Sequence, residues 1–106
     1  MVTYNQAAVF HALADPTRRG ILDLLRSRER SAGDLAHQFP VSRPAVSRHL
    51  RVLRGAGLVV HRKEAQSRVY RLAPEALREV DRWLDNYRVF WTARMHDLKR
   101  YVEERQ

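Results

Sequence analysis

The amino-acid sequence predicts a mostly α-helical protein with one small β-hairpin, an α+β class, in a single domain of 106 residues. Two observations carry this prediction. Apolar residues recur every three or four positions in five segments, as on the buried face of a helix. Between residues 58 and 72, β-branched residues alternate with charged ones instead, which is typical of paired strands.

The first three helices are short and bounded by strong signals. The segment 5–14, "NQAAVFHALA", is predicted as a helix that Asp15 and Pro16 stop. A second helix begins there, with Asp15 as N-cap and Pro16 at the first helical position. Ser31 caps a third helix in a capping-box-like start, and Pro40 ends it. We expect these side chains to be available for the core: Ala8, Phe10, Leu13, Ile21, Leu22, Leu24 and Leu25.

The fourth helix and the hairpin follow without a linker. Ser42 is a good N-cap, Pro44 is tolerated in the first turn, and Gly55 and Gly57 terminate the helix. The strands "LVVHRKE" and "SRVYRL" are separated by a polar "AQ" turn. The core-facing residues of this part are predicted to be Val46, Leu50, Leu53, Tyr70 and Leu72.

A single long helix is predicted over residues 74–104. It carries more large apolar side chains than one face of a surface helix needs, and such a surface on a terminal helix indicates a dimer interface rather than a ligand site. This surface predicts a homodimer. The interface residues are predicted to be Phe10, Trp83, Tyr87, Phe90, Trp91, Met95, Leu98 and Tyr101.

Positive charge is concentrated on the fourth helix and the hairpin. Residues 42–72 hold eight Arg and Lys residues against one Glu, a net +7, whereas the whole chain has a net charge of +8. Such a distribution is the electrostatic footprint expected on a nucleic acid.

The fourth helix separates an apolar stripe from a cationic, hydroxylated face. A short helix and a turn precede it, so the segment 31–57 is interpreted as a helix-turn-helix and the hairpin 58–72 as its wing. Double-stranded DNA is the predicted partner, with direct readout mainly by Arg43, Ser47 and Arg48. The predicted DNA-binding residues are Ser42, Arg43, Pro44, Ser47, Arg48, His49, Arg51, Arg54, Arg62, Lys63 and Arg68.

Other classes of function find little support in the sequence. The chain has no Cys, no Gly-rich phosphate loop and no Ser, His and carboxylate grouping, so catalysis is not expected. Its five His residues are scattered, and no cofactor or metal site is predicted. The sequence has no apolar run of 18 residues and no signal-peptide pattern, so no membrane contact and a cytoplasmic location are expected.

Together the motifs "DPTRRGIL", "VSRPAVSRHLRVLRGAGLV" and "RVYRL" resemble the ArsR (ArsR/SmtB) family of bacterial winged-helix regulators, over almost the whole chain. The resemblance implies a dimer paired through its first and last helices, a pseudo-palindromic operator and repression of transcription. Metal sensors of that family often carry paired Cys in the third helix, where this chain has Ser31 and Gly33. The last helix has only His96 near Asp97, and its "FWTAR" segment is similar to the non-metal branch.

Three alternatives stay open at this point. One is a metal-responsive repressor of the same fold. Another is a non-specific nucleoid-type or RNA-binding protein, and the third is a winged helix that binds protein. The residues identify neither a small-molecule nor a metal effector.

Overall fold

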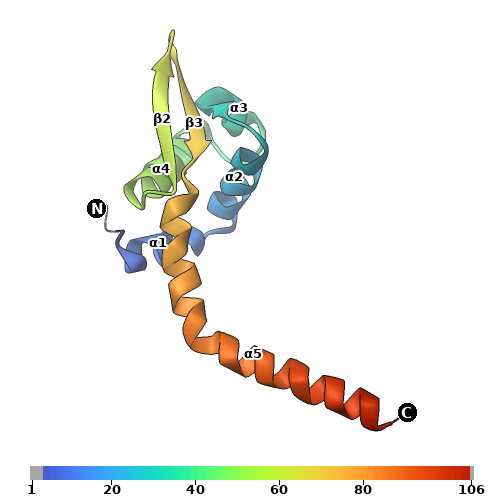
Figure 1. Cartoon of the computed structure of the whole chain (residues 1–106). Coiled ribbons are helices and arrows are strands. Elements are labelled where there is room, and N and C mark those ends of the chain that lie inside the picture. Colours follow the sequence, from blue (N-terminus) through green and yellow to red (C-terminus); the bar gives the residue numbers. More distant parts are fainter. Residues whose placement is uncertain (1–3, 106) are drawn as a thin grey trace.

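The computed structural model describes residues 4–105 and confirms a mostly helical chain with a small antiparallel sheet. Four helices and the hairpin form a body from which the last helix projects, so that the molecule measures 64 × 33 × 20 Å (Figure 1). The elements in chain order are α1 (Gln6–Leu13), α2 (Pro16–Ser27), β1 (Arg30–Ser31), α3 (Ala32–His37), α4 (Arg43–Gly55), β2 (Val59–Glu64), β3 (Ser67–Leu72), the 3-10 turn η1 (Pro74–Leu77) and α5 (Arg78–Glu104).

The predicted N-caps are confirmed. Asp15 accepts a hydrogen bond from the backbone N–H of Arg18 at 3.0 Å, and Ser42 accepts one from Ala45 at 3.2 Å. Ser31 accepts one from Asp34 at 3.1 Å. The Asp34 carboxylate bonds to the guanidinium of Arg30 at 3.1 Å rather than back to the cap, so the capping box is only half made.

The core lies between α1, α2, α3, α4 and the base of the hairpin. Ile21, Leu53 and Leu58 are fully buried there, as helical and strand periodicity require. In α1 the buried residues are Val9 and Ala12. Four residues that the sequence analysis expected in the core are only half-buried, namely Ala8, Phe10 and Leu13 of α1 and Leu24 of α2.

The last residue of α4 is Gly55, and a Schellman motif with Gly57 after the C-cap residue Ala56 closes the helix. The N–H of Leu58 donates to the carbonyl of Leu53, and the N–H of Gly57 donates to that of Arg54, both at 3.0 Å. Gly57 has a φ of +80°, and a Cβ there would lie 2.8 Å from the ring of Tyr4. This position therefore requires glycine, and it turns the chain directly into β2.

The sheet contains one strand more than the sequence predicted. The order is β1-β3-β2, with the two-residue β1 paired to β3 through Arg30↔Tyr70 and Ser31↔Val69. A strand of two residues, the second of which is also the N-cap of α3, is too short to show the alternation that identifies a strand. This added strand joins the end of α2 to the wing.

The long helix also starts later than predicted, because Pro74–Leu77 form a 3-10 turn before α5 begins at Arg78. Such turns are common at helix starts, and this one buries Ala76 completely. Only the first turns of α5 meet the body, where Phe10 packs edge-on against Trp83 at a centroid distance of 5.4 Å. The helix then continues into solvent.

Candidate nucleic-acid interface

One face of α4 belongs to the core and the other is open. Val46, Leu50 and Leu53 are buried as predicted, and they hold the helix against the body. The capped first turn presents Ser42, Arg43 and Pro44, all exposed. Ser47, Arg48, Arg51 and Arg54 are likewise exposed along the helix.

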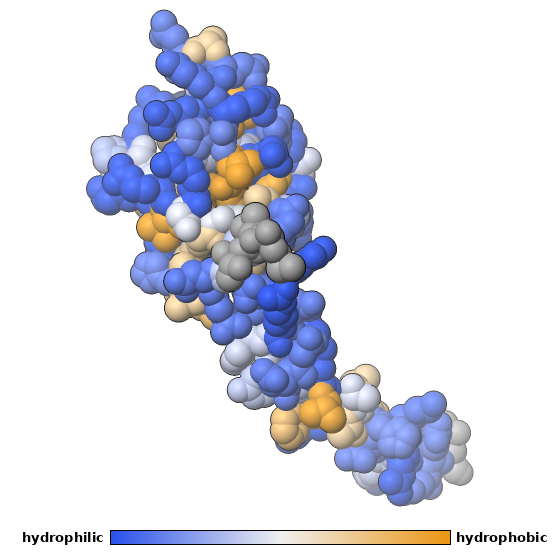
Figure 2. Space-filling model, turned by 60° about the vertical axis from the view of Figure 1, so that its left-hand side comes forward, coloured by the Kyte–Doolittle hydropathy of each residue, from blue (hydrophilic) through white to orange (hydrophobic). Residues whose placement is uncertain are grey.

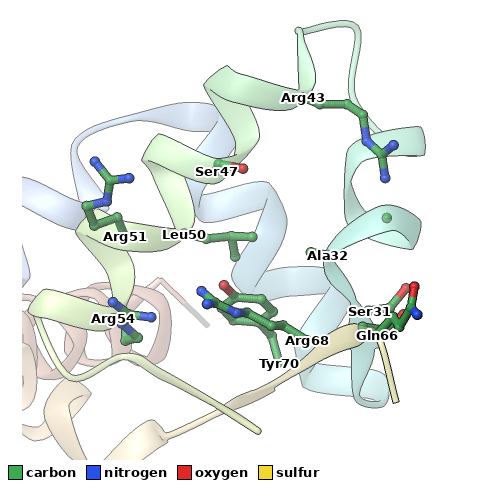
Figure 3. Close-up of a pocket in the computed structure, with 12 residues that line it drawn as sticks. Ser31, Ala32, Arg43, Ser47, Leu50, Arg51, Arg54, Gln66, Arg68 and Tyr70 are labelled. Atoms are coloured by element: carbon green, nitrogen blue, oxygen red, sulfur yellow. The ribbon is translucent and has the colours of Figure 1, made fainter. Parts of the chain in front are cut away.

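A groove of about 550 Å³ separates α4 from the hairpin and from the start of α3. Figure 3 shows Arg43, Ser47, Arg51 and Arg54 along the α4 side, with Arg68 and Tyr70 across from them. The nearly buried Leu50 and Tyr70 form its floor. The full lining is Ser31, Ala32, Gly33, Arg43, Ser47, Leu50, Arg51, Arg54, Gln66, Ser67, Arg68 and Tyr70.

The charge of this groove has one sign. Four arginines line it, and none of its lining residues, all within the described part of the chain, is acidic. Guanidinium groups on two opposite sides of a polar channel suit a phosphate backbone, which they can bind through paired N–H donors. The tertiary structure thus brings four of the eleven predicted DNA-binding residues, Arg43, Arg51, Arg54 and Arg68, and the hydroxyl of a fifth, Ser47, to one surface.

The groove also includes residues that the sequence analysis did not assign to a DNA site. Ser31, Ala32 and Gly33 come from the start of α3, and Gln66 and Ser67 come from the wing. A Cβ on Gly33 would lie 3.1 Å from Nη2 of Arg43, so this glycine leaves space for the arginine side chain. Their small or polar side chains give no charge signal, and only the packing of α3 beside α4 reveals them.

The two faces of the wing differ in charge. Directly paired residues of β2 and β3 share a face, so Lys63 and Arg68 lie on the same face as the pair His61 and Tyr70. This is the face that borders the groove. Arg62 lies on the opposite face, where its guanidinium bonds to Glu29 at 2.6 and 3.2 Å and to Glu64 at 3.0 Å. The predicted DNA contact of Arg62 stays a prediction, and this geometry gives it no support, since strand alternation turns the side chain away from the groove into an exposed ion pair.

His49 points into the body rather than along the groove. Its Nδ1 lies 3.2 Å from a guanidinium nitrogen of Arg18 and 3.9 Å from the carboxylate of Asp15. Arg18 also donates to the carbonyls of Ala12 at 2.8 Å and His11 at 3.0 Å. This geometry gives His49 a role in joining α4 to α1 and α2, and its predicted phosphate contact gains no support.

A second histidine, His61, contacts two of the residues that line the groove. The ring of His61 lies 5.2 Å from that of Tyr70, and Arg54 contacts its Nε2. Burial lowers the pKa of His61, and the nearby positive charges of Arg54 and Arg68 lower it further. His61 is therefore neutral at pH 7 and adds no charge to the groove.

The residues predicted to form a dimer interface are mostly exposed along α5. Figure 2 shows hydrophobic side chains gathered on its projecting part, away from the body. Phe10 is half-buried against Trp83, which contacts Tyr87 in turn. Trp83, Tyr87, Phe90, Trp91, Met95, Leu98 and Tyr101 are all at least two-fifths exposed.

The described residues offer neither a metal site nor a membrane-spanning helix. In the range 4–105 no cluster of three or more His, Asp or Glu side chains could hold a metal ion. None of the helices in that range combines the length and the apolar character that crossing a membrane requires.

Comparison with known proteins points in one direction. Residues 15–60 match the family described as "Bacterial regulatory protein, arsR family". The chain is 45% identical over 93 residues to the HTH-type transcriptional regulator Rv2034 of Mycobacterium tuberculosis, covering 87% of this chain and 84% of that protein. It is 39% identical over 79 residues to the transcriptional repressor SdpR of Bacillus subtilis, covering 74% and 88% respectively.

Solved structures agree with the sequence relatives. An ArsR-like transcriptional regulator from Rhodococcus sp. RHA1 is similar with a TM-score of 0.68 and 37% identity, over 90% of both chains. A crystal structure of another ArsR family transcriptional regulator is similar with a TM-score of 0.76 and 30% identity, over 87% of this chain and 97% of that one.

Proposed function

This chain belongs to the arsR family of bacterial regulatory proteins, and we propose that it binds a pseudo-palindromic operator in duplex DNA as a homodimer and represses transcription. Membership of this family makes it a DNA-binding transcriptional regulator and not an enzyme. Beyond what family membership shows, we propose four properties: a homodimer, a pseudo-palindromic operator, repression of transcription and a cytoplasmic location.

The observation that carries the proposal is the uniformly cationic groove between α4 and the wing. In the proposed complex, the exposed first turns of α4 enter the major groove and the adjoining phosphate backbone follows this cationic groove. Arg43, Ser47 and Arg48 read base edges, while Arg51 and Arg54 meet phosphates. Ser42 and Pro44 lie at the same helix start, and Lys63 and Arg68 hold the flanking backbone from the wing.

Two copies are needed because one α4 reads only a half-site. The exposed apolar side chains of α5 supply a self-complementary surface of the kind that buries aromatic and Met residues in dimers. Pairing through α5 would direct the two α4 helices to successive major grooves, about 34 Å apart.

The test starts with duplexes selected by the protein from a random-sequence library, so that no operator need be known. Affinity is then measured by fluorescence anisotropy over a range of salt concentrations. We expect Arg43→Ala to weaken binding by about 1–3 kcal/mol and to relax the preference at the base it contacts. Arg26→Ala removes the same charge from an exposed site on α2 outside the groove, and should change affinity little.

Two results would contradict the proposal. A mixed-sequence competitor that displaces the selected duplex at equal concentration would favour a non-specific nucleic-acid-binding protein. An unchanged base preference in Arg43→Ala would remove this residue from the reading surface.

A further inference from the structure

Glu29 lies at a junction that the DNA-facing groove does not use. It stands between the end of α2 at Ser27 and β1, which begins at Arg30. Its carboxylate receives two hydrogen bonds from Arg62 on β2, at 2.6 and 3.2 Å. This paired geometry is the most directional that a carboxylate and a guanidinium can adopt.

The ion pair spans the sheet from one edge to the other. β3 lies between β1 and β2, and Glu29 directly precedes the residue of β1 that pairs with Tyr70. Arg62 pairs with Val69 of the same central strand. The side chains of Glu29 and Arg62 therefore meet across β3 and tie the loop after α2 to the far strand of the hairpin.

Near Arg62 the sheet narrows from three strands to two. β1 pairs with β3 only at Tyr70 and Val69, so no third strand accompanies the hairpin beyond Val69. From there to the tip, Lys63↔Arg68 and Glu64↔Ser67 form a two-stranded ribbon. Such ribbons are marginally stable alone, and the tip carries Lys63 and Arg68. A tether at Arg62 acts where the free ribbon begins.

On the face of the sheet that carries Arg62, acidic and basic side chains are present in equal number. Arg62 is held by Glu29 and also by Glu64 at 3.0 Å. The hydrogen bond from Arg62 lowers the pKa of Glu29, and the hydrogen bond to Glu29 raises the pKa of Arg62. Arg71 adds its positive charge near Glu29. The two acidic and two basic groups cancel, whereas Lys63 and Arg68 on the groove face lack such partners among the described ion pairs.

We propose that Glu29 is a positioning residue of the wing, which holds Arg62 so that the free end of the hairpin directs Lys63 and Arg68 toward bound DNA. The role of Arg62 is then to be held by the body and not to contact phosphate. The inference rests on the proposed function in one respect, namely that the wing meets DNA.

Exchanging the two charges in a double variant tests this idea at unchanged net charge, whereas each single variant changes the net charge by two units. The variants are Glu29→Arg, Arg62→Glu and the double variant, with circular dichroism to verify the fold. Hydrogen exchange of the amides of residues 63–68 reports on the ribbon directly. We expect exchange to become about two- to fivefold faster in each single variant, as for loss of an exposed ion pair, and to return to the wild-type rate in the double variant.

DNA-binding affinity distinguishes the proposed role of Arg62 as a tether of the wing from direct contact of Arg62 with phosphate. The probe is the duplex selected by the wild-type protein, in about 0.1 M salt. We expect Arg62→Glu to bind about fivefold or more weakly, and the double variant to recover to within about twofold of the wild type. Direct contact of Arg62 with phosphate predicts instead that the double variant stays as weak as Arg62→Glu.

Either of two outcomes would overturn the inference: unchanged exchange in both single variants, or restored exchange in the double variant without recovery of affinity. Failure of the proposed function has a different signature. If Lys63→Ala and Arg68→Ala bind DNA as the wild type does while the exchange data follow the expected pattern, the tether stands and the wing contact does not.

Discussion

Trp91 offers the clearest test of the proposed dimer, because its contribution can be worked out from its exposure. The side chain is 52% exposed on α5. An aromatic side chain of this size has up to about 250 Å² to bury, so about 130 Å² of Trp91 is open to a partner. At about 25 cal/mol per Å², full coverage contributes about 3 kcal/mol per protomer.

A symmetric dimer loses this side chain twice. Even if the partner covers only half of the open area, Trp91→Ala should weaken the dimer by about 3 kcal/mol, or a little over a hundredfold in dissociation constant. Sedimentation equilibrium over a range of protein concentrations measures this change directly.

Val89 supplies a matched control on the same helix. It is 65% exposed, but it lies two positions from both Tyr87 and Trp91, which places it on the other side of α5 from their stripe. Val89→Ala should leave the dissociation constant within about threefold of the wild type, since exposed sites outside an interface contribute little. If Trp91→Ala dissociates no more readily than Val89→Ala, or if the wild type is monomeric at the highest concentration, the α5 surface is not the interface.

Two predictions concern the stability of the body. Gly57→Ala should lower the free energy of unfolding by about 1–3 kcal/mol in urea titration, because the backbone is left-handed there and the new methyl group meets Tyr4; an unchanged midpoint would refute the Schellman assignment. The backbone N–H of Arg18 lowers the pKa of Asp15 in the folded state, so the charge of Asp15 stabilises the fold above the unfolded pKa and this contribution disappears as the pH falls through the folded value. Asp15→Asn keeps a competent cap, and should therefore be less stable than the wild type at pH 7 and equal to it near pH 2; a difference independent of pH would show that the charge is not involved.

Local sequence signals were sufficient to predict where most of the helices begin. Asp15, Ser31 and Ser42 cap their helices as their positions indicate, because capping depends on residues only three positions apart. The buried stripe of Val46, Leu50 and Leu53 follows from the same local geometry. The 3-10 turn at Pro74–Leu77 and the strand β1 escaped this reasoning, since each is too short to show a period.

The candidate DNA-binding residues could be listed from the sequence, but their arrangement could not. The net charge of residues 42–72 identified a cationic segment, but charge alone does not assign each arginine to a face. Arg62 and Lys63 are neighbours in sequence, and their charges do not distinguish them. They lie on opposite sides of the sheet, because successive residues of a strand point in opposite directions.

The class of fold, the helix that carries the cationic face and the family of the chain follow from local periodicity, caps and motifs, which can be recognised in the sequence alone. Which arginines form ion pairs depends on how distant segments pack. Glu29 is 33 residues from Arg62 in the chain, yet β1 beside β3 brings the two into contact on the side of the sheet away from the cationic groove. Partners so distant in sequence leave no periodic signal, so that choice is made when the strands pair.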